Sequence, residues 1–170
     1  YGILLVDDEV MSGFGRTGKW FAVDHWGVTP DIMTMAKGLT SGYVPLAAVV
    51  VSEPIARFFE DKVLYGGLTY GSHPLGCAAG VATVQVYEEE GLIDNSAHLG
   101  QFLGRRLEEL KARHPSVGDV RYIGLFSAIE LVKDRATKEP LPAAPLNSFL
   151  REQGLFGFLP INLIFVTPPL

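Results

Sequence analysis

Lys37 is the residue whose surroundings point most directly to chemistry. It is the only charged side chain from Ile32 to Ser52, and its neighbours Met35 and Leu39 are apolar. An ammonium group in apolar surroundings loses hydration, which favours the neutral amine, a nucleophile suited to a Schiff base. The alternative is a structural lysine that reaches from the end of a buried strand to solvent.

Asp8 is the second candidate, a carboxylate at the end of an apolar run. In an extended segment Asp8 shares a face with Val6 and Val10, while Asp7 and Glu9 lie on the other face. A carboxylate among apolar neighbours needs a cationic partner, and a cofactor with a protonatable ring nitrogen would supply one. A capping or salt-bridging aspartate is the alternative.

Two glycine-rich loops carry further candidates. Residues 13–18 match the pattern G-x-G-x-x-G, but two residues separate them from the strand and no long helix follows, so we expect no dinucleotide site. The loop from Gly66 to Pro74 runs into a helix, where backbone N–H groups and the Thr69 hydroxyl can hold a phosphate. An N-cap turn is the alternative there. For His73 a structural hydrogen bond is favoured, and scattered histidines with one cysteine predict no metal site.

Composition narrows the class of protein. The 170 residues are 48% hydrophobic and 19% charged, which excludes a disordered chain, and the net charge of −5 provides no general basic surface for nucleic acid or anionic membranes. No apolar run is long enough to span a bilayer. A single cysteine, Cys77, fits a reducing compartment. We therefore expect a cytoplasmic protein with small-molecule partners.

The elements that must position these residues have an α/β pattern. Short apolar runs at 3–6, 32–35 and 46–52 predict buried strands, and a helix of small residues is expected from Pro74. Leucines at spacings of three and four predict an amphipathic helix capped by Asp94. A strand at 125–132, a helix at 146–153 and a strand at 163–166 follow. The predicted units are residues 1–91 and 92–170. Because the sequence opens on an apolar strand-like run and stops just after another, we expect it to be an internal or C-terminal piece of a longer chain.

Together the motifs resemble the class III aminotransferases, the pyridoxal-phosphate enzymes that include ω-amino acid:pyruvate and amine transaminases. The resemblance covers essentially the whole chain. Its motifs are Asp8-Glu9-Val10, Gly13–Gly18, Pro30-Asp31-Ile32, Ala36-Lys37-Gly38, Ser41–Pro45, Thr69-Tyr70 with His73-Pro74, and Pro168-Pro169-Leu170. The family implies fold type I, as in aspartate aminotransferase. Residues 1–91 would then be the latter part of the large cofactor domain with its mostly parallel sheet, and residues 92–170 a smaller, incomplete α+β C-terminal domain.

The resemblance also implies roles for four residues. Lys37 would form the Schiff base with pyridoxal phosphate, Asp8 would pair with the pyridine nitrogen, and Val10 would pack against the ring. Thr69 would contact the phosphate bound to the other subunit of a homodimer. The implied reaction is a ping-pong transfer of an amino group from an amine or ω-amino acid to a 2-oxo acid such as pyruvate.

Departures from the family pattern leave alternatives open. The family often has Ser-Gly before His-Pro, whereas this sequence has Gly71-Ser72. Met11 stands where some members have glutamine. Phe158 or Pro160 lies where some relatives carry an arginine that binds a substrate carboxylate. With Phe156, this favours amines or ω-amino acids over dicarboxylic donors. The phosphate-binding loop and ring-stacking aromatic of the family are not in this sequence. A pyridoxal-phosphate aminomutase or racemase, or a non-catalytic remnant or dimerisation fragment, are the other interpretations.

Overall fold

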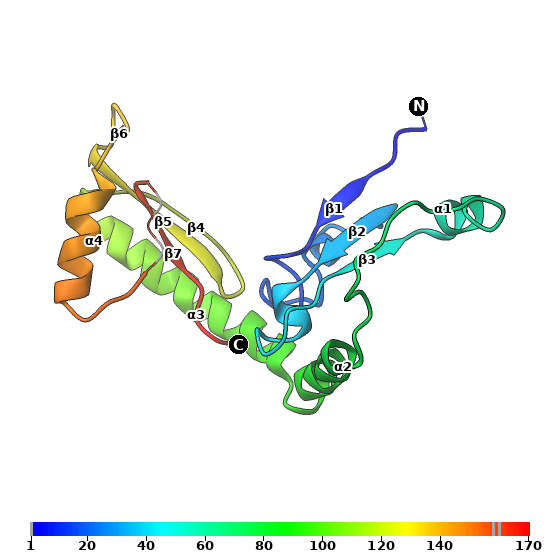
Figure 1. Ribbon diagram of the computed structural model, residues 1–170. Helices are drawn as coiled ribbons and strands as arrows, with labels where there is room; N and C mark the ends of the chain where they lie inside the picture. Colours follow the sequence, from blue (N-terminus) through cyan, green and yellow to red (C-terminus); the bar gives the residue numbers. More distant parts are fainter. Residues whose placement is uncertain (1, 158, 160) are drawn as a thin grey trace. The chain divides into compact units, whose positions relative to one another are not determined.

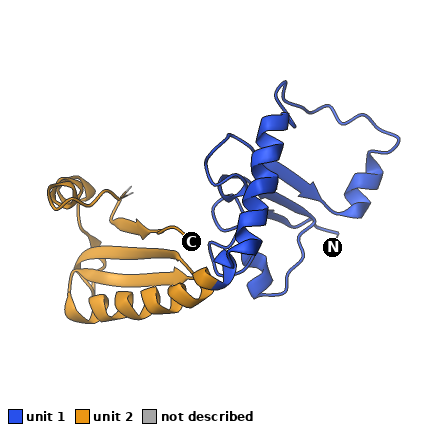
Figure 2. Ribbon diagram, turned by 90° about the horizontal axis from the view of Figure 1, so that it is seen from below, with its two compact units in different colours: residues 1–94 blue, residues 95–170 orange. Residues whose placement is uncertain are grey.

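The chain folds into two compact units, Tyr1–Asp94 and Asn95–Leu170, which Figure 2 shows in different colours. The structure is a computed structural model that describes residues 2–157, 159 and 161–170. Phe158 and Pro160, which entered the substrate prediction, lie outside the described residues. Each unit is described by itself.

The first unit contains a three-stranded sheet in the order β1-β2-β3 (Figure 1). β1 (Val6–Asp8) runs parallel to β2 (Ile32–Met35), and β3 (Ala48–Val51) is antiparallel to β2. One of the two strand pairs is therefore parallel. The parallel pair brings the carboxyl ends of β1 and β2 to the same edge, which is where open α/β sheets bind ligands.

The strands of this sheet differ from the prediction in extent and in burial. β1 begins at Val6 rather than at Ile3, although Leu5 O still accepts hydrogen bonds from the N–H groups of Asp31 and Ile32 at 2.9 and 3.1 Å. The predicted buried character is wrong for β1 and β3 among the described residues, because Val6 is 59% exposed and Val49 is 64% exposed, whereas Met35 of β2 is buried. These two valines lie on the same face of the sheet. No described element covers them on that face.

The first unit also contains helical segments. They are the 3₁₀ turns η1 (Ala22–His25) and η2 (Lys37–Leu39) and the helices α1 (Glu53–Phe58) and α2 (Pro74–Glu89). The helix predicted from Pro74 is confirmed. Its first turn is capped by His73, whose Nδ1 accepts a hydrogen bond from Leu75 N at 3.2 Å. The structural role predicted for His73 is thus confirmed.

The second unit places the long helix α3 (Leu92–Arg113), from Asn95 onward, beside an antiparallel sheet. The sheet consists of β4 (Val117–Ile123), β5 (Phe126–Asp134), β6 (Glu139–Pro140) and β7 (Leu163–Val166), with β5 pairing all three others. The helix α4 (Ala143–Glu152) lies between β6 and β7 in the chain. The buried core is formed by Leu107, Val117, Val120, Ile129 and Leu131.

Small residues allow α3 to approach the β4–β5 hairpin. A Cβ atom at Gly104 would lie 2.2 Å from Tyr122 Cε2, and one at Gly100 would lie 2.4 Å from Gly124 Cα. Larger residues at either position would push the helix away from the sheet. The amphipathic helix was predicted, but it begins at Leu92, so Asp94 lies in its first turn and is not its cap.

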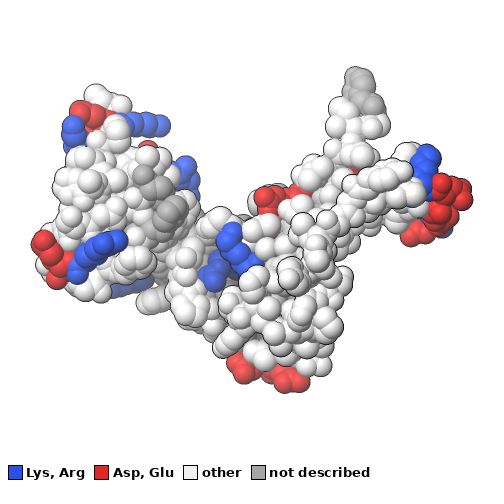
Figure 3. Space-filling model, viewed as in Figure 1, with Lys and Arg blue, Asp and Glu red and all other residues white. Residues whose placement is uncertain are grey.

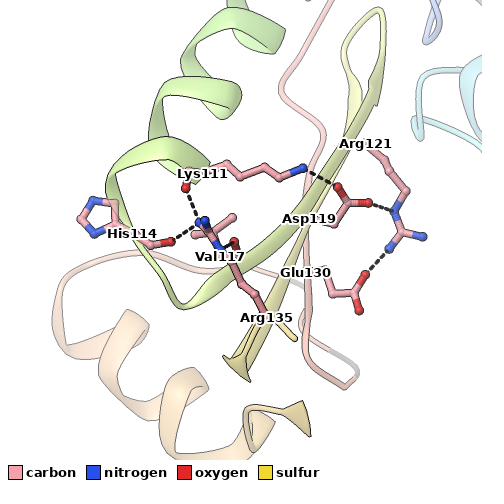
Figure 4. Close-up of polar contacts among 7 residues, drawn as sticks. All are labelled: Lys111, His114, Val117, Asp119, Arg121, Glu130 and Arg135. Carbon is pink, nitrogen blue, oxygen red and sulfur yellow. Dashed lines mark hydrogen bonds and ion pairs between the residues drawn. The ribbon is translucent and has the colours of Figure 1, made fainter. Parts of the chain in front are cut away.

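Polar contacts hold the C-terminal end of α3 to the sheet (Figure 4). Lys111 Nζ lies 2.7 Å from Asp119 Oδ1, and Arg121 bonds Glu130 at 3.1 Å. Arg135 donates to the carbonyl oxygens of Lys111, Val117 and His114. The hydrogen bond from Lys111 lowers the pKa of Asp119, and the same bond raises the pKa of Lys111. These contacts therefore join the end of α3 to β4 and to the segment that follows β5.

The charge distribution agrees with the composition. In the view of Figure 3 most of the surface is uncharged, and Lys and Arg side chains form small separate groups. Within residues 2–157, 159 and 161–170 no helix is both long and apolar enough to cross a membrane. The same residues contain no cluster of three or more His, Cys, Asp or Glu side chains suited to a metal ion.

Candidate active site

Asp8 and Lys37 lie at the same edge of the first sheet. Asp8 is the last residue of β1 and pairs with Thr34 of β2, and Glu9 N donates to Thr34 O at 2.9 Å. Lys37 opens the turn η2 directly after β2. The parallel pairing thus places both side chains at the carboxyl ends of neighbouring strands, as expected for an α/β ligand site.

Lys37 occupies an unusual backbone conformation. Its φ angle is +38°, in the left-handed region that side chains rarely adopt. Its side chain is exposed, so the prediction that apolar neighbours remove its hydration is wrong for the described residues. The reason is that Met35 is buried in the sheet and Leu39 packs near Gly80 of α2, so neither covers the ammonium. Lys37 Nζ has no hydrogen-bond or ion-pair partner among the described residues.

Asp8 combines a capping contact with a free oxygen. Its Oδ1 accepts a hydrogen bond from Val10 N at 2.9 Å, which agrees with the capping interpretation. Oδ2 has no hydrogen-bond partner in the part of the chain that the structure describes, and the residue is exposed. Asp8 lies on the open face with Val6, as the alternation predicted, and Val10 is half-buried. One carboxylate oxygen is therefore available to a ligand.

Glu9 is a structural residue of the site that the sequence analysis did not single out. It is 1% exposed, and its carboxylate accepts hydrogen bonds from Val23 N at 3.0 Å and from the Ser12 hydroxyl. Its carbonyl oxygen accepts from Gly13 N at 3.0 Å. The available signal was the alternation, because Glu9 lies on the face opposite Asp8. Burial, followed by the charge of Glu9, raises the pKa of Asp7 on that same face.

The loop at residues 13–18 is packed into the unit. Phe14 and Thr17 are buried, and His25 Nε2 lies 3.0 Å from the Thr17 carbonyl oxygen. Arg16 is half-buried, and this burial lowers its pKa. The loop follows β1 only after intervening residues and leads into the short turn η1 rather than a long helix. This geometry agrees with the exclusion of a dinucleotide site.

Thr69 lies outside this edge, in an exposed segment before α2. Gly71 N donates to Leu68 O at 2.9 Å, which closes a turn around Thr69, and the residues from 60 to 75 are all exposed. Thr69 has no side-chain hydrogen bond within the described residues. The chain therefore brings Lys37, Asp8 and Val10 together, whereas Thr69 contributes to no common site within this unit.

The residues at the edge fit pyridoxal phosphate, the cofactor that the resemblance implies. Its aldehyde requires an amine with no competing partner, as at Lys37, and its ring nitrogen requires a carboxylate with a free oxygen, as at Asp8. Oδ1 of Asp8 is held by the Val10 amide, so the carboxylate is oriented before a ligand binds. The donor set thus suits a pyridine aldehyde better than a metal ion.

Comparison with known proteins finds similar aminotransferases. Taurine–pyruvate aminotransferase of Bilophila wadsworthia is 44% identical over 170 residues, covering 94% of this chain and 36% of the relative. Putrescine–pyruvate aminotransferase of Pseudomonas aeruginosa is 38% identical over 176 residues, covering 100% of this chain and 38% of the relative. The chain therefore spans less than two-fifths of the length of these two curated relatives.

Solved structures match in the same way. A taurine:2-oxoglutarate aminotransferase from Bifidobacterium kashiwanohense, in complex with pyridoxal phosphate and glutamate, superposes with a TM-score of 0.95 and 44% identity over 99% of this chain and 40% of that one. An (S)-enantioselective ω-transaminase from Thermomicrobium roseum superposes with a TM-score of 0.93 and is 42% identical, covering 99% of this chain and 39% of that one. These neighbours establish the α/β architecture as that of fold type I transaminases. Since the family model for aminotransferase class III also matches residues 1–170, the chain belongs to the class III aminotransferases, which use pyridoxal phosphate.

Proposed function

We propose that the protein carrying these residues transfers an amino group from an amine or ω-amino acid to a 2-oxo acid such as pyruvate. The observation that carries the proposal is the juxtaposition of Lys37 and Asp8 at the ends of two parallel strands in a chain of this family. In the net reaction the donor leaves as an oxo compound and the 2-oxo acid leaves as an amino acid. No external oxidant or reductant is needed.

Lys37 has two tasks in this proposal. Its Nζ would hold pyridoxal phosphate covalently, and the substrate amine would displace it. The displaced amine would then act as base and acid, taking the proton from the amino-bearing carbon of the substrate. The absence of any competing partner for Nζ among the described residues supports both tasks.

Asp8 and Val10 orient the ring. The free Oδ2 of Asp8 would accept a hydrogen bond from the protonated pyridine nitrogen, and a charged pair of this kind would favour the protonated form. Bound pyridoxal phosphate supplies an electron sink for the carbon that loses its proton. The half-buried side chain of Val10 would pack against one face of the ring. The Val10 amide, bonded to Asp8 Oδ1, supports this arrangement by fixing the carboxylate.

Thr69 acts on a second subunit in this proposal. The segment around it exposes apolar side chains, among them Tyr65 at 95%, Leu68 and Tyr70. Such exposure in a segment rich in aromatic residues is typical of a surface that another chain covers. This exposure is compatible with the role that the family resemblance implies, in which Thr69 contacts the phosphate bound to the other subunit of a homodimer. In the same proposal, residues 1–91 belong to the large cofactor domain and residues 92–170 to the small domain. A cytoplasmic location stays a prediction.

The proposed donor class follows from two observations. The names of the relatives include taurine and putrescine, two amines that lack a carboxylate beside the amino group. The second observation is the apolar side chain of Phe156, which is 84% exposed and for which the sequence favours amines or ω-amino acids over dicarboxylic donors. We expect faster turnover with amines than with glutamate as donor, and initial rates with each donor and pyruvate test this order.

Borohydride reduction tests the proposed function. The protein at its full length is incubated with pyridoxal phosphate, reduced and digested, and mass spectrometry locates the label. We expect the label on Lys37 and none in Lys37→Ala, while the control Lys19→Ala, which removes an exposed lysine bonded to Asp24 O, keeps it. A label on another lysine contradicts the proposal.

Dependence on the oxo acid separates amino transfer from isomerisation. An aminomutase or racemase converts its amine without a 2-oxo acid, whereas the proposed transaminase needs one in every cycle. Continued turnover without an oxo acid would favour the isomerase, and a protein that never binds the cofactor would favour the non-catalytic remnant.

A further inference from the structure

The backbone at Lys37 needs support from outside its own turn. A non-glycine residue at φ +38° is less stable than one in the right-handed region and persists only where surrounding contacts impose it. Within the turn, Leu39 N donates to Ala36 O at 2.9 Å and Thr40 N donates to Lys37 O at 3.3 Å. These bonds are local, so they do not fix the turn relative to the rest of the unit.

Tyr87 of α2 supplies a long-range contact. Its hydroxyl donates a hydrogen bond of 2.8 Å to the carbonyl oxygen of Gly38, the residue after Lys37. Tyr87 is 6% exposed, and burial raises its pKa, an effect that the positive charge of Arg16 opposes. The phenol therefore stays protonated as a donor. The bond joins the lysine turn to a helix that is distant in sequence.

Phe14 closes the other side of the turn. A Cβ atom at position 38 would lie 2.8 Å from Phe14 Cβ, so only glycine fits there without displacement. The ring of Phe14 stacks on Tyr87 with centroids 6.2 Å apart, and Trp20 meets Tyr87 edge-on at 6.0 Å. These aromatic contacts restrict the Tyr87 ring and keep its hydroxyl directed at Gly38.

We propose that Tyr87 is a positioning residue for Lys37: by its hydrogen bond to the carbonyl oxygen of Gly38, a residue that also lies close to Phe14, its hydroxyl keeps the lysine in the left-handed conformation from which Nζ moves the proton. The inference rests on the proposed function. Tyr87 touches neither substrate nor cofactor in this account. Its loss therefore slows proton transfer without weakening amine binding.

The test is the amine half-reaction of the Tyr87→Phe variant, which loses the hydroxyl and keeps the ring. The full-length protein is loaded with pyridoxal phosphate, and rates are referred to occupied sites by absorbance. We expect the rate at saturating amine to fall about tenfold, consistent with one lost hydrogen bond, with the half-saturating amine concentration within about twofold. Deuterium on the amino-bearing carbon should give a larger isotope effect than in the wild type.

Two further variants complete the experiment. Tyr122→Phe removes a phenol hydroxyl from the second unit and should leave rate and isotope effect unchanged. Gly38→Ala disturbs the same turn from the Phe14 side and should reproduce the slower rate. Hydrogen exchange in the protein without cofactor should show faster exchange of the Leu39, Thr40 and Ser41 amides in Tyr87→Phe.

An unchanged rate and isotope effect in Tyr87→Phe would overturn the inference, and so would a change confined to the half-saturating concentration. Unfolding of both Tyr87→Phe and Gly38→Ala would also overturn it, since both residues would then serve stability alone. A wild-type protein that takes no label on Lys37 contradicts the proposed function instead.

Discussion

The two units of the chain are held together by different kinds of contacts. The second unit has a contiguous apolar core, centred on Leu107 and Ile129, and adds ion pairs such as Lys111–Asp119 at its margin. The first unit leaves Val6 and Val49 of its sheet exposed and holds its site with buried polar and aromatic contacts, chiefly those of Glu9 and Tyr87. Stability and chemistry thus rest on largely separate sets of residues, which single substitutions can separate.

Asp8→Asn should have the largest effect, and it should fall on activity. Asparagine can still accept from the Val10 amide, but it loses the charge that pairs with a protonated ring nitrogen. A charge-assisted hydrogen bond contributes about 1.5–3 kcal/mol, so we expect kcat to fall roughly 10- to 100-fold. The melting temperature should change little, since Asp8 is exposed. Asp61→Asn, at another exposed aspartate, is the kinetic control, and equal losses in both variants would refute the role of Asp8.

Gly104→Ala should give the largest loss of stability in the second unit. The added methyl group meets the Tyr122 ring at 2.2 Å, and overpacking of this kind costs about 1–3 kcal/mol. Thermal unfolding measures the loss. Gly67→Ala, where a Cβ atom meets nothing within 4 Å, is the matched control. Similar melting temperatures for the two variants would show that α3 does not depend on this close approach.

Glu9→Gln should weaken the first unit by a smaller amount. The amide keeps one oxygen for Val23 N but cannot accept from the Ser12 hydroxyl as the carboxylate does. We expect a loss of about 1–2 kcal/mol in the free energy of unfolding, measured by urea denaturation. A matched change at an exposed site, Glu60→Gln, should be neutral. If Glu9→Gln is equally neutral, the buried carboxylate does not organise the loop.

Acidification should have the smallest effect, at Asp119. Its pKa is lowered in the folded state, so its contribution is present above the unfolded value of 3.8 and is lost as the pH falls through the lower folded value. Asp119→Asn should therefore lower the melting temperature by no more than about 2 °C at pH 7, because the pair is partly exposed, and by less below pH 3. A difference that grows on acidification has the wrong sign for this account.

Local patterns in the sequence were sufficient for some elements and not for others. α2 and β7 were predicted because Pro74, small residues and a β-branched apolar run determine them locally. β4 was missed because Gly118, Asp119 and Arg121 interrupt its apolar alternation, and only its pairing with β5 makes it a strand.

The site shows the same division. The positions of Lys37 and Asp8 at the ends of two strands were predictable, because one is the single charge in an apolar stretch and the other ends an apolar run, while their roles stay a prediction. The exposure of Lys37, the burial of Glu9 and the bond from Tyr87 to Gly38 arise from contacts between segments distant in sequence. No local pattern encodes such contacts, since they depend on how the segments pack.

A crystal structure of the full-length protein with pyridoxal phosphate tests the central claim most directly. We expect continuous electron density between Lys37 Nζ and the cofactor, and Asp8 Oδ2 at about 2.7–2.9 Å from the ring nitrogen. A cofactor joined to a different lysine, or a ring nitrogen with no contact to Asp8, would contradict the account.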